Sequence, residues 1–182
     1  MAGSKVNMRQ FELAMDKAIK EVESVSSMRS LGEEMAERIR KRTRLGKGVA
    51  ETGAAPQPLK PLSASYKATR AGKIAFATAK DGHVYPYKPD EAPKLHPHTT
   101  PGRSNLTRTG QMLDSLRVIA VRVGVAVLGL HGPRNDSKLS NADVGGYVSK
   151  ERPFLNLSKP ELNGLATLIR ERIEAALRKF RA

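Results

Sequence analysis

The sequence contains no cysteine and no tryptophan, and its four tyrosines and four phenylalanines make up only 4% of 182 residues. The lack of cysteine excludes disulfides, thiolate zinc sites and thiol catalysis. No run of about 18 apolar residues occurs, so no segment is expected to cross a bilayer as a helix. Residues 1–10 also lack the apolar stretch of a secretory signal. We therefore expect a soluble protein made in a cytoplasm, with a core of aliphatic residues.

Positive charge is the strongest feature of the composition. Lysine and arginine number 32 against 18 acidic residues, which gives a net charge of +14 and a pI near 10.3. Such a charge favours polyanions or acidic protein surfaces as partners. The excess is spread along the chain, and residues 111–149 hold four basic and three acidic residues. A dedicated nucleic-acid module more often concentrates its charge.

One basic run is dense enough to be a candidate contact site for a polyanion or a partner. Its members are Arg38, Arg40, Lys41, Arg42, Arg44 and Lys47. They fall at the end of a predicted helix, where cations are favoured by the helix dipole. A solvated helix end is therefore the competing interpretation. No aromatic residue lies among them, which disfavours recognition of single strands by stacking.

The first third of the chain predicts helix. Apolar residues from Phe11 to Ile39 recur at steps of three and four over residues 6–44. A helix of that length would measure about 58 Å, so we expect either a projecting helix or two helices, with the serine-rich residues 24–30 and Gly32 as weak points. Residues 46–105 are rich in proline and glycine and predict irregular structure, with a short helix near residues 62–70 and an extended arm over 80–103.

The last part of the chain predicts a small sheet and a helix. Residues 111–115 read as a helical turn, and residues 117–123 and 125–130 as a β-hairpin. A polar loop over 132–146 is expected to lead into a further strand at Tyr147 and Val148. Ser158 and Glu161 form a capping box that begins an amphipathic helix over 158–182.

These elements predict an α+β fold with one domain overall. Residues 1–45 form a helix or helix pair, residues 46–105 an irregular proline- and glycine-rich segment with an extended arm, and residues 106–182 a small antiparallel sheet packed by the C-terminal amphipathic helix.

Catalytic patterns are lacking. His96 and His98 lie two residues apart, but a metal site needs three or four ligands, and no acidic residue or cysteine is spaced to help them. Neither a phosphate-binding glycine loop nor a nucleophile elbow occurs. We therefore expect no catalytic residue, no metal and no cofactor, and an enzyme is the weakest of the hypotheses considered.

Three segments, in order, resemble a family of bacteriophage proteins. They are Pro58-Leu-Lys-Pro-Leu-Ser-Ala-Ser-Tyr66, Leu106-Thr-Arg-Thr-Gly-Gln-Met-Leu-Asp-Ser-Leu116 and Arg152-Pro-Phe-Leu-Asn-Leu-Ser158. Together they resemble the virion morphogenesis or tail-completion proteins of Mu-like and P2-like phages, and the third segment is the most specific. The positions that carry the resemblance are Leu106, Thr109, Gly110, Leu113, Ser115, Arg152, Pro153, Phe154 and Leu155.

The resemblance implies a structural, non-catalytic protein of the phage neck or tail. It would form a ring, of six or twelve copies, at the junction between head and tail. Its other partners would be portal, connector or head-closure proteins, the tail terminator or tail tube, and DNA crossing the lumen, with no membrane. It would be assembled in the bacterial cytoplasm and end in the virion.

This chain also departs from the family's pattern. Lys60-Pro61 stands where the family often has a tryptophan, residues 141–147 replace a histidine–glutamine–aromatic–glycine segment, and residues 80–103 resemble an insertion. The position within the neck or tail is left open. The competing hypothesis is a basic nucleic-acid-binding protein without catalytic activity.

The motif residues suit structural roles. Thr109-Gly110 predicts a tight turn with positive φ at the glycine. Arg152 before Pro153 predicts extended backbone. Phe154 and Leu155 are expected to fill the gap between sheet and C-terminal helix, with core packing as the plain interpretation of Phe154 and partner contact as the alternative.

Overall fold

The computed structural model describes residues 8–62, 76–78, 84–86, 106, 110–134 and 138–179. The helices in these residues are α1 (Met8–Val22), α2 (Val25–Arg44), α4 (Gln111–Asp114), α5 (Asn141–Glu151) and α6 (Lys159–Lys179). The strands are β1 (Lys47–Gly48), β2 (Gln57–Pro58), β3 (Phe76–Thr78), β4 (Val84–Pro86), β5 (Leu116–Arg122) and β6 (Val125–Leu130). The fold is a mixture of helices and small antiparallel sheets, as the α+β prediction requires.

The predicted N-terminal helix is divided in two. The α-helical hydrogen bonds stop at Glu23 and Ser24, and the Ser24 side chain accepts from the backbone N of Ser27 at 3.3 Å to begin α2. A serine oxygen is a favoured acceptor for the unpaired N–H groups of a first helical turn. The break therefore falls at the start of the serine-rich stretch, and Gly32 lies inside α2 without interrupting it.

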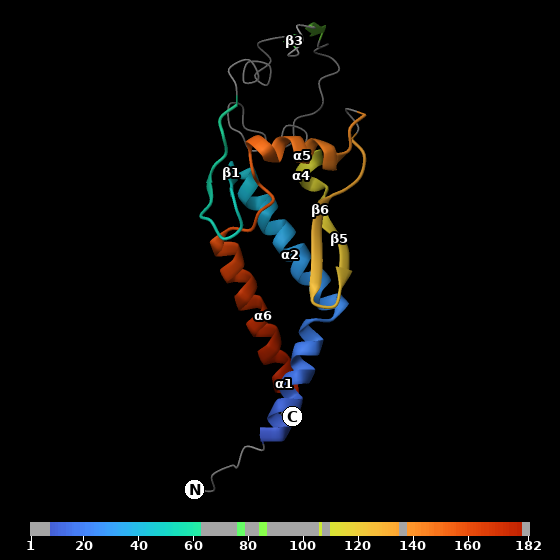
Figure 1. Cartoon of the computed structure of the whole chain (residues 1–182), viewed down its shortest axis with the longest axis vertical. Coiled ribbons are helices and arrows are strands. Elements are labelled where there is room, and N and C mark those ends of the chain that lie inside the picture. The colour runs from blue at the N-terminus through green and yellow to red at the C-terminus, as the bar shows by residue number, and fades with distance from the viewer. Residues whose placement is uncertain are drawn as a thin grey trace.

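The predicted hairpin is confirmed, and α2 covers it. β5 pairs with β6 in antiparallel register, from Leu116 opposite Leu130 to Arg122 opposite Val125, with an irregularity between Val118 and Ala120. α2 crosses one face of this hairpin (Figure 1). Gly32 permits the crossing, because a Cβ at this position would lie 2.6 Å from Cγ2 of Val118.

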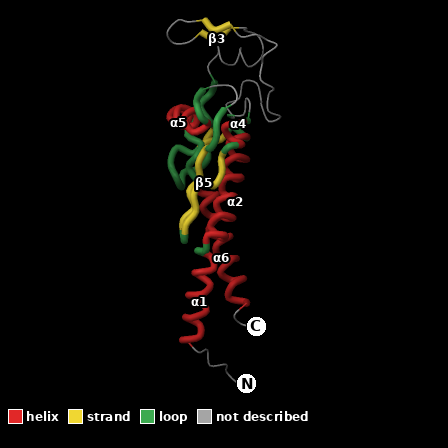
Figure 2. The backbone as a smooth tube through the Cα atoms, turned by 90° about the vertical axis from the view of Figure 1, so that its right-hand side faces the viewer, coloured by secondary structure: helices red, strands yellow, loops and turns green. Residues whose placement is uncertain are grey.

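The C-terminal helix does not occupy the place predicted for it. The capping box of Ser158 and Glu161 is confirmed, but α6 packs mainly against α1 and, to a lesser extent, α2. The views in Figures 1 and 2 agree that α1 and the C-terminal half of α6 project together as a stalk beyond the hairpin. The prediction of a sheet packed by the C-terminal helix was therefore wrong, because α2 already covers the apolar face of the hairpin.

The region predicted as polar loop and strand is partly helix. α5 begins within the predicted loop and includes Tyr147 and Val148. Ser140 and Asp143 form its capping box. The strand prediction was wrong here. Gly145 brings this helix close to β6, since a Cβ here would collide with Cδ1 of Leu130 unless that side chain shifted.

Two hydrophobic clusters make the core, and both lie near the end of α2. One joins Ala36 and Ile39 of α2 to Leu116 of β5. The other joins Met112 and Leu113 of α4 to Phe154. No helix within the described ranges is long and apolar enough to cross a membrane.

The middle of the chain contains two short strand pairs. β1 pairs with β2, and β3 pairs with β4. The short helix predicted near residues 62–70 lies, after Leu62, outside the described residues. So does the arm predicted over 80–103, apart from β4.

Candidate interaction site at the end of α2

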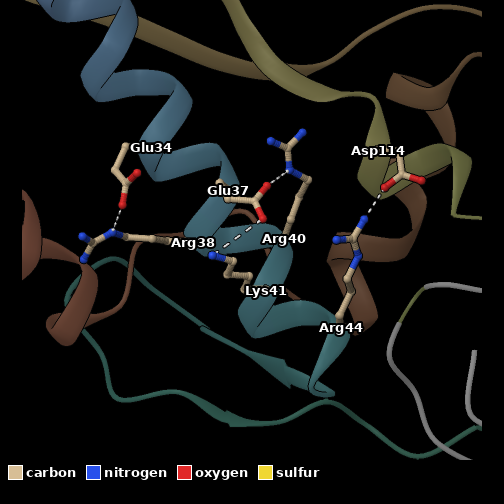
Figure 3. Close-up of polar contacts among 7 residues, drawn as sticks. All are labelled: Glu34, Glu37, Arg38, Arg40, Lys41, Arg44 and Asp114. Atoms are coloured by element: carbon tan, nitrogen blue, oxygen red, sulfur yellow. Dashed lines mark hydrogen bonds and ion pairs between the residues drawn. The ribbon is translucent and has the colours of Figure 1, made fainter. Parts of the chain in front are cut away.

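The basic run lies along the second half of α2 and beyond it. Arg38 donates from Nε to Glu34 at 2.9 Å, and Arg40 donates from Nε to Glu37 at 2.9 Å (Figure 3). Arg40 also donates from Nη1 to the backbone oxygen of Leu116 at 3.0 Å, which ties α2 to the start of β5. Both arginines are thus held by carboxylates one turn earlier on the same helix.

Arg42 is buried and joins distant parts of the chain. It donates from Nη1 to Glu161 of α6 and from Nη2 to the backbone oxygen of Phe154. Burial lowers the pKa of the Arg42 guanidinium, and the Glu161 carboxylate opposes that shift. The same Glu161 oxygen accepts from N and Oγ of Ser158 at 2.6 and 2.7 Å. A side chain enclosed in this way cannot reach an external polyanion while the fold is intact.

The remaining cations divide into engaged and exposed ones. Arg44 forms an ion pair with Asp114 of α4 (Figure 3). Lys41 is 72% exposed and lies 4.0 Å from Glu37, and Lys47 is exposed on β1. The predicted contact site therefore presents Lys41 and Lys47 most openly. Contact with a polyanion stays a prediction.

The second motif segment forms the turn into β5. Gly110 has φ 77°, as expected for the turn, and Thr109 lies outside the described residues. Leu113 is fully buried, and Leu106, at φ 55°, packs against the same cluster. Ser115 donates from Oγ to the backbone oxygen of Met112 at 2.7 Å, which ends the short helix.

The third motif segment crosses the first. Arg152 has φ −138° and ψ 76°. This backbone avoids the helical region, as expected before Pro153, but it is not the regular extended conformation that was predicted. Its guanidinium donates to the backbone oxygens of Lys60 at 3.1 Å and Pro61 at 3.3 Å. The oxygen of Pro153 accepts from the backbone N of Val49 at 3.0 Å.

Phe154 and Leu155 behave differently from each other. Phe154 is fully buried among α4, α5 and the end of β6, so the interpretation as core packing is confirmed. Leu155 is 38% exposed, so its predicted role as a filler between sheet and helix was wrong. Phe154 fills the space beneath α5 rather than one against α6.

Two asparagines, not singled out in the sequence, hold this region together. Asn141 donates from Nδ2 to three successive carbonyls, those of residues 131–133, at 3.2 to 3.3 Å. Asn156 donates to the backbone oxygens of Val49 at 3.1 Å and Ala50 at 2.8 Å. Asn156 lies inside the third motif segment, and this position in the motif could have drawn attention to it. Asn141 follows the capping residue Ser140. Its role was missed because the surrounding residues have the polar composition of a loop.

The described part of this region is held by buried packing, hydrogen bonds and ion pairs. Over the described ranges, no group of three or more histidine, cysteine, aspartate or glutamate side chains is placed to hold a metal ion. His83, His96 and His98 lie outside those ranges. Comparisons with protein-family models, curated proteins and solved structures found no match to this chain.

Proposed function

We propose that this protein is a structural, non-catalytic component of a bacteriophage neck or tail that assembles into a ring at the head–tail junction. Its partners would be further copies of itself, in six or twelve positions, together with portal, connector or head-closure proteins and the tail terminator or tail tube. DNA would cross the lumen. It would be assembled in the host cytoplasm and retained in the virion.

The observation that carries the proposal is the meeting of the three segments that resemble the phage family. Arg152 of the third segment binds the backbone of Lys60 and Pro61 in the first. Phe154 of the third packs against Met112 and Leu113 in the second. Segments that are far apart in the sequence thus form one contiguous unit, which supports treating them as a single inherited feature.

The distribution of apolar side chains also supports an assembly. Large apolar residues are exposed on α1, on the hairpin and at its tip; they include Met8, Phe11, Leu13, Ile119, Val123 and Val127. Exposed apolar patches of this kind are typical of surfaces that contact other proteins. A protein whose work is to join others needs such surfaces and no reaction centre.

Cryo-electron microscopy of whole virions tests the proposal. The expected result is a ring of this chain between portal and tail. Light scattering on the purified protein should show a closed oligomer at high concentration. A protein that remains monomeric at all concentrations and is absent from virions would contradict the proposal.

A nucleic-acid-binding role is the second candidate, because the net charge is +14 and Lys41 and Lys47 are exposed. Replacing both lysines by glutamate should weaken DNA retention and lower the slope of its salt dependence by about two, roughly one per phosphate contact. Lys20 and Lys150 replaced by glutamate form the control. An equal loss of DNA retention in both double variants would indicate that the protein binds DNA through its overall charge and not at a defined site.

A further inference from the structure

An apolar groove of about 440 Å³ lies between α6, α2, the α1–α2 break and the inner side of β6. Leu165, Ile169 and Ile173 of α6 line one wall, and Ala126 and Leu128 of β6 line another. Glu23, at the helix break, is the one charged residue among those lining it. A hollow of this size and composition is suited to receive several apolar side chains.

The opposite face of the same hairpin carries an exposed apolar surface. Ile119 is 50% and Val127 40% exposed, and Val123 at the turn is 68% exposed. The inward face holds Leu116, which is fully buried. Figure 2 shows the hairpin on one side of α2, and α2 packs against the hairpin through residues that include Leu116 and Val118. The outward face is thus apolar and uncovered by any described element.

Charge distinguishes the groove from the outward face. Arg117 and Arg122 are the only charged residues of the hairpin, and both are exposed. Glu23 of the groove and Arg122 of the hairpin have no ion-pair partner within the described residues. An apolar surface flanked by arginine and an apolar groove edged by glutamate are complementary.

The two surfaces lie on opposite sides of one hairpin and meet at its turn, where the backbone N of Gly124 donates to the backbone oxygen of Glu23 in the same chain at 2.9 Å. A contact between two different patches of identical chains is heterologous, and it generates a ring when the rotation closes. This relation selects a second copy of the chain as the occupant, because the chain carries both halves of the contact.

We propose that the outward face of the β5–β6 hairpin of one copy docks into the groove between α2, β6 and α6 of the next, with Arg122 facing Glu23 across the contact. The inference rests on the proposed function, since it names the contact through which copies would form the ring. Each copy then inserts the outward face of its hairpin into one neighbour and receives the hairpin of the other neighbour in its groove.

Charge reversal tests the contact without altering the core. Glu23→Arg alone and Arg122→Glu alone should each weaken self-association by about tenfold, because like charges then meet. A one-to-one mixture of the two variants should restore association, since each remaining contact joins opposite charges. An effect within one chain could not be restored by mixing. Sedimentation velocity measures the association.

Glu33→Arg and Arg29→Glu are the matched controls, because these exposed residues of α2 do not line the groove. They should associate as the parent does. Circular dichroism of every variant identifies any loss of fold. The inference is overturned if Glu23→Arg and Arg122→Glu both associate as strongly as the parent, or if their mixture does not recover association. Neither result would contradict the proposal that the protein forms a ring. A parent that never self-associates overturns both.

Disulfide trapping provides a second measurement, which the absence of native cysteine makes clean. A chain with Val127→Cys and Ile169→Cys should oxidise to a ladder of covalent multimers. A chain with Val127→Cys and Thr167→Cys, whose second cysteine lies on the exposed side of α6, should not progress beyond dimers. Equal ladders, or a small apolar molecule extracted from the groove of an assembled parent, would overturn the inference.

Discussion

The two ends of α2 are packed in contrasting ways. At its C-terminal end, β1, α4, α5 and the segment before α6 converge, and Ile39, Leu113 and Phe154 are almost completely buried there. At its N-terminal end, α1 and α6 form a two-helix stalk in which Ala18 and Val22 are the buried residues of α1. The closed end holds the fold together, and the open end presents apolar surface.

The difference shows where stability and binding reside. A closed end resists substitution, because its side chains have neighbours on all sides. An open end tolerates substitution in the isolated chain but would be sensitive once a partner covers it. The following predictions test this contrast, from the largest effect on stability to the smallest.

Replacing Phe154 by alanine should reduce the free energy of unfolding by about 3–5 kcal/mol, because a fully buried ring is removed and leaves a cavity. Leu13 on α1 is 55% exposed, so Leu13→Ala should change the free energy of unfolding by less than about 0.5 kcal/mol. Urea denaturation measures both. Similar losses in the two variants would remove the contrast between the ends.

Glu161→Gln should destabilise the fold by about 3 kcal/mol, because it leaves the buried Arg42 guanidinium without its counter-charge. Replacing Glu174, whose contact with Arg178 is 3.6 Å long and exposed, by glutamine should cost less than about 0.5 kcal/mol. Thermal unfolding followed by circular dichroism gives the comparison. A Glu161→Gln variant as stable as the parent would show that the ion pair is dispensable.

Two adjacent glycines of α5 should respond with opposite signs. Gly145→Ala should destabilise by about 1–3 kcal/mol, since the methyl group collides with Leu130. Gly146→Ala meets no atom within 4 Å and should stabilise the helix by up to about 1 kcal/mol. Denaturation midpoints report the difference. Equal effects would mean that α5 does not press against β6 in solution.

The smallest effect concerns acid pH. Hydrogen bonds from the side chain and then the backbone of Ser140 lower the pKa of Asp143. The stabilisation is therefore present above the ordinary aspartate pKa of about 3.9 and is lost as the pH falls through the lowered folded-state value. Asp143→Asn should flatten that part of the melting profile below about pH 4. A profile identical to that of the parent would exclude a contribution from this capping box.

Local patterns in the sequence were sufficient for several elements. β-Branched residues on either side of Gly124 located the hairpin, and the Ser158–Glu161 box located the start of α6, because both signals depend on residues close in sequence. α5 was missed since Gly145 and Gly146 disfavour helix, although Ser140 and Asp143 carried the capping signal. Gly145 packs closely against Leu130. This contact joins two elements of the tertiary structure, so local sequence patterns do not reveal it.

Long-range partners were beyond local patterns. Gly32 was interpreted as a weak point of a helix, yet it is a position where a Cβ would lie 2.6 Å from Cγ2 of Val118 on β5. The pairing of Arg38 with Glu34 follows from helical spacing. The pairing of Arg42 with Glu161, 119 residues away, does not. The basic run was therefore recognised, while its largely internal use was not.

The link between Arg42 and Glu161 also bears on how the chain acquires its structure during synthesis. At about 5–20 residues per second, a ribosome adds the acidic partner roughly 6–24 s after the arginine. Throughout that interval the guanidinium lacks the carboxylate that it pairs with in the folded chain. The contact that joins α2 to α6 therefore forms only after residue 161 has been added.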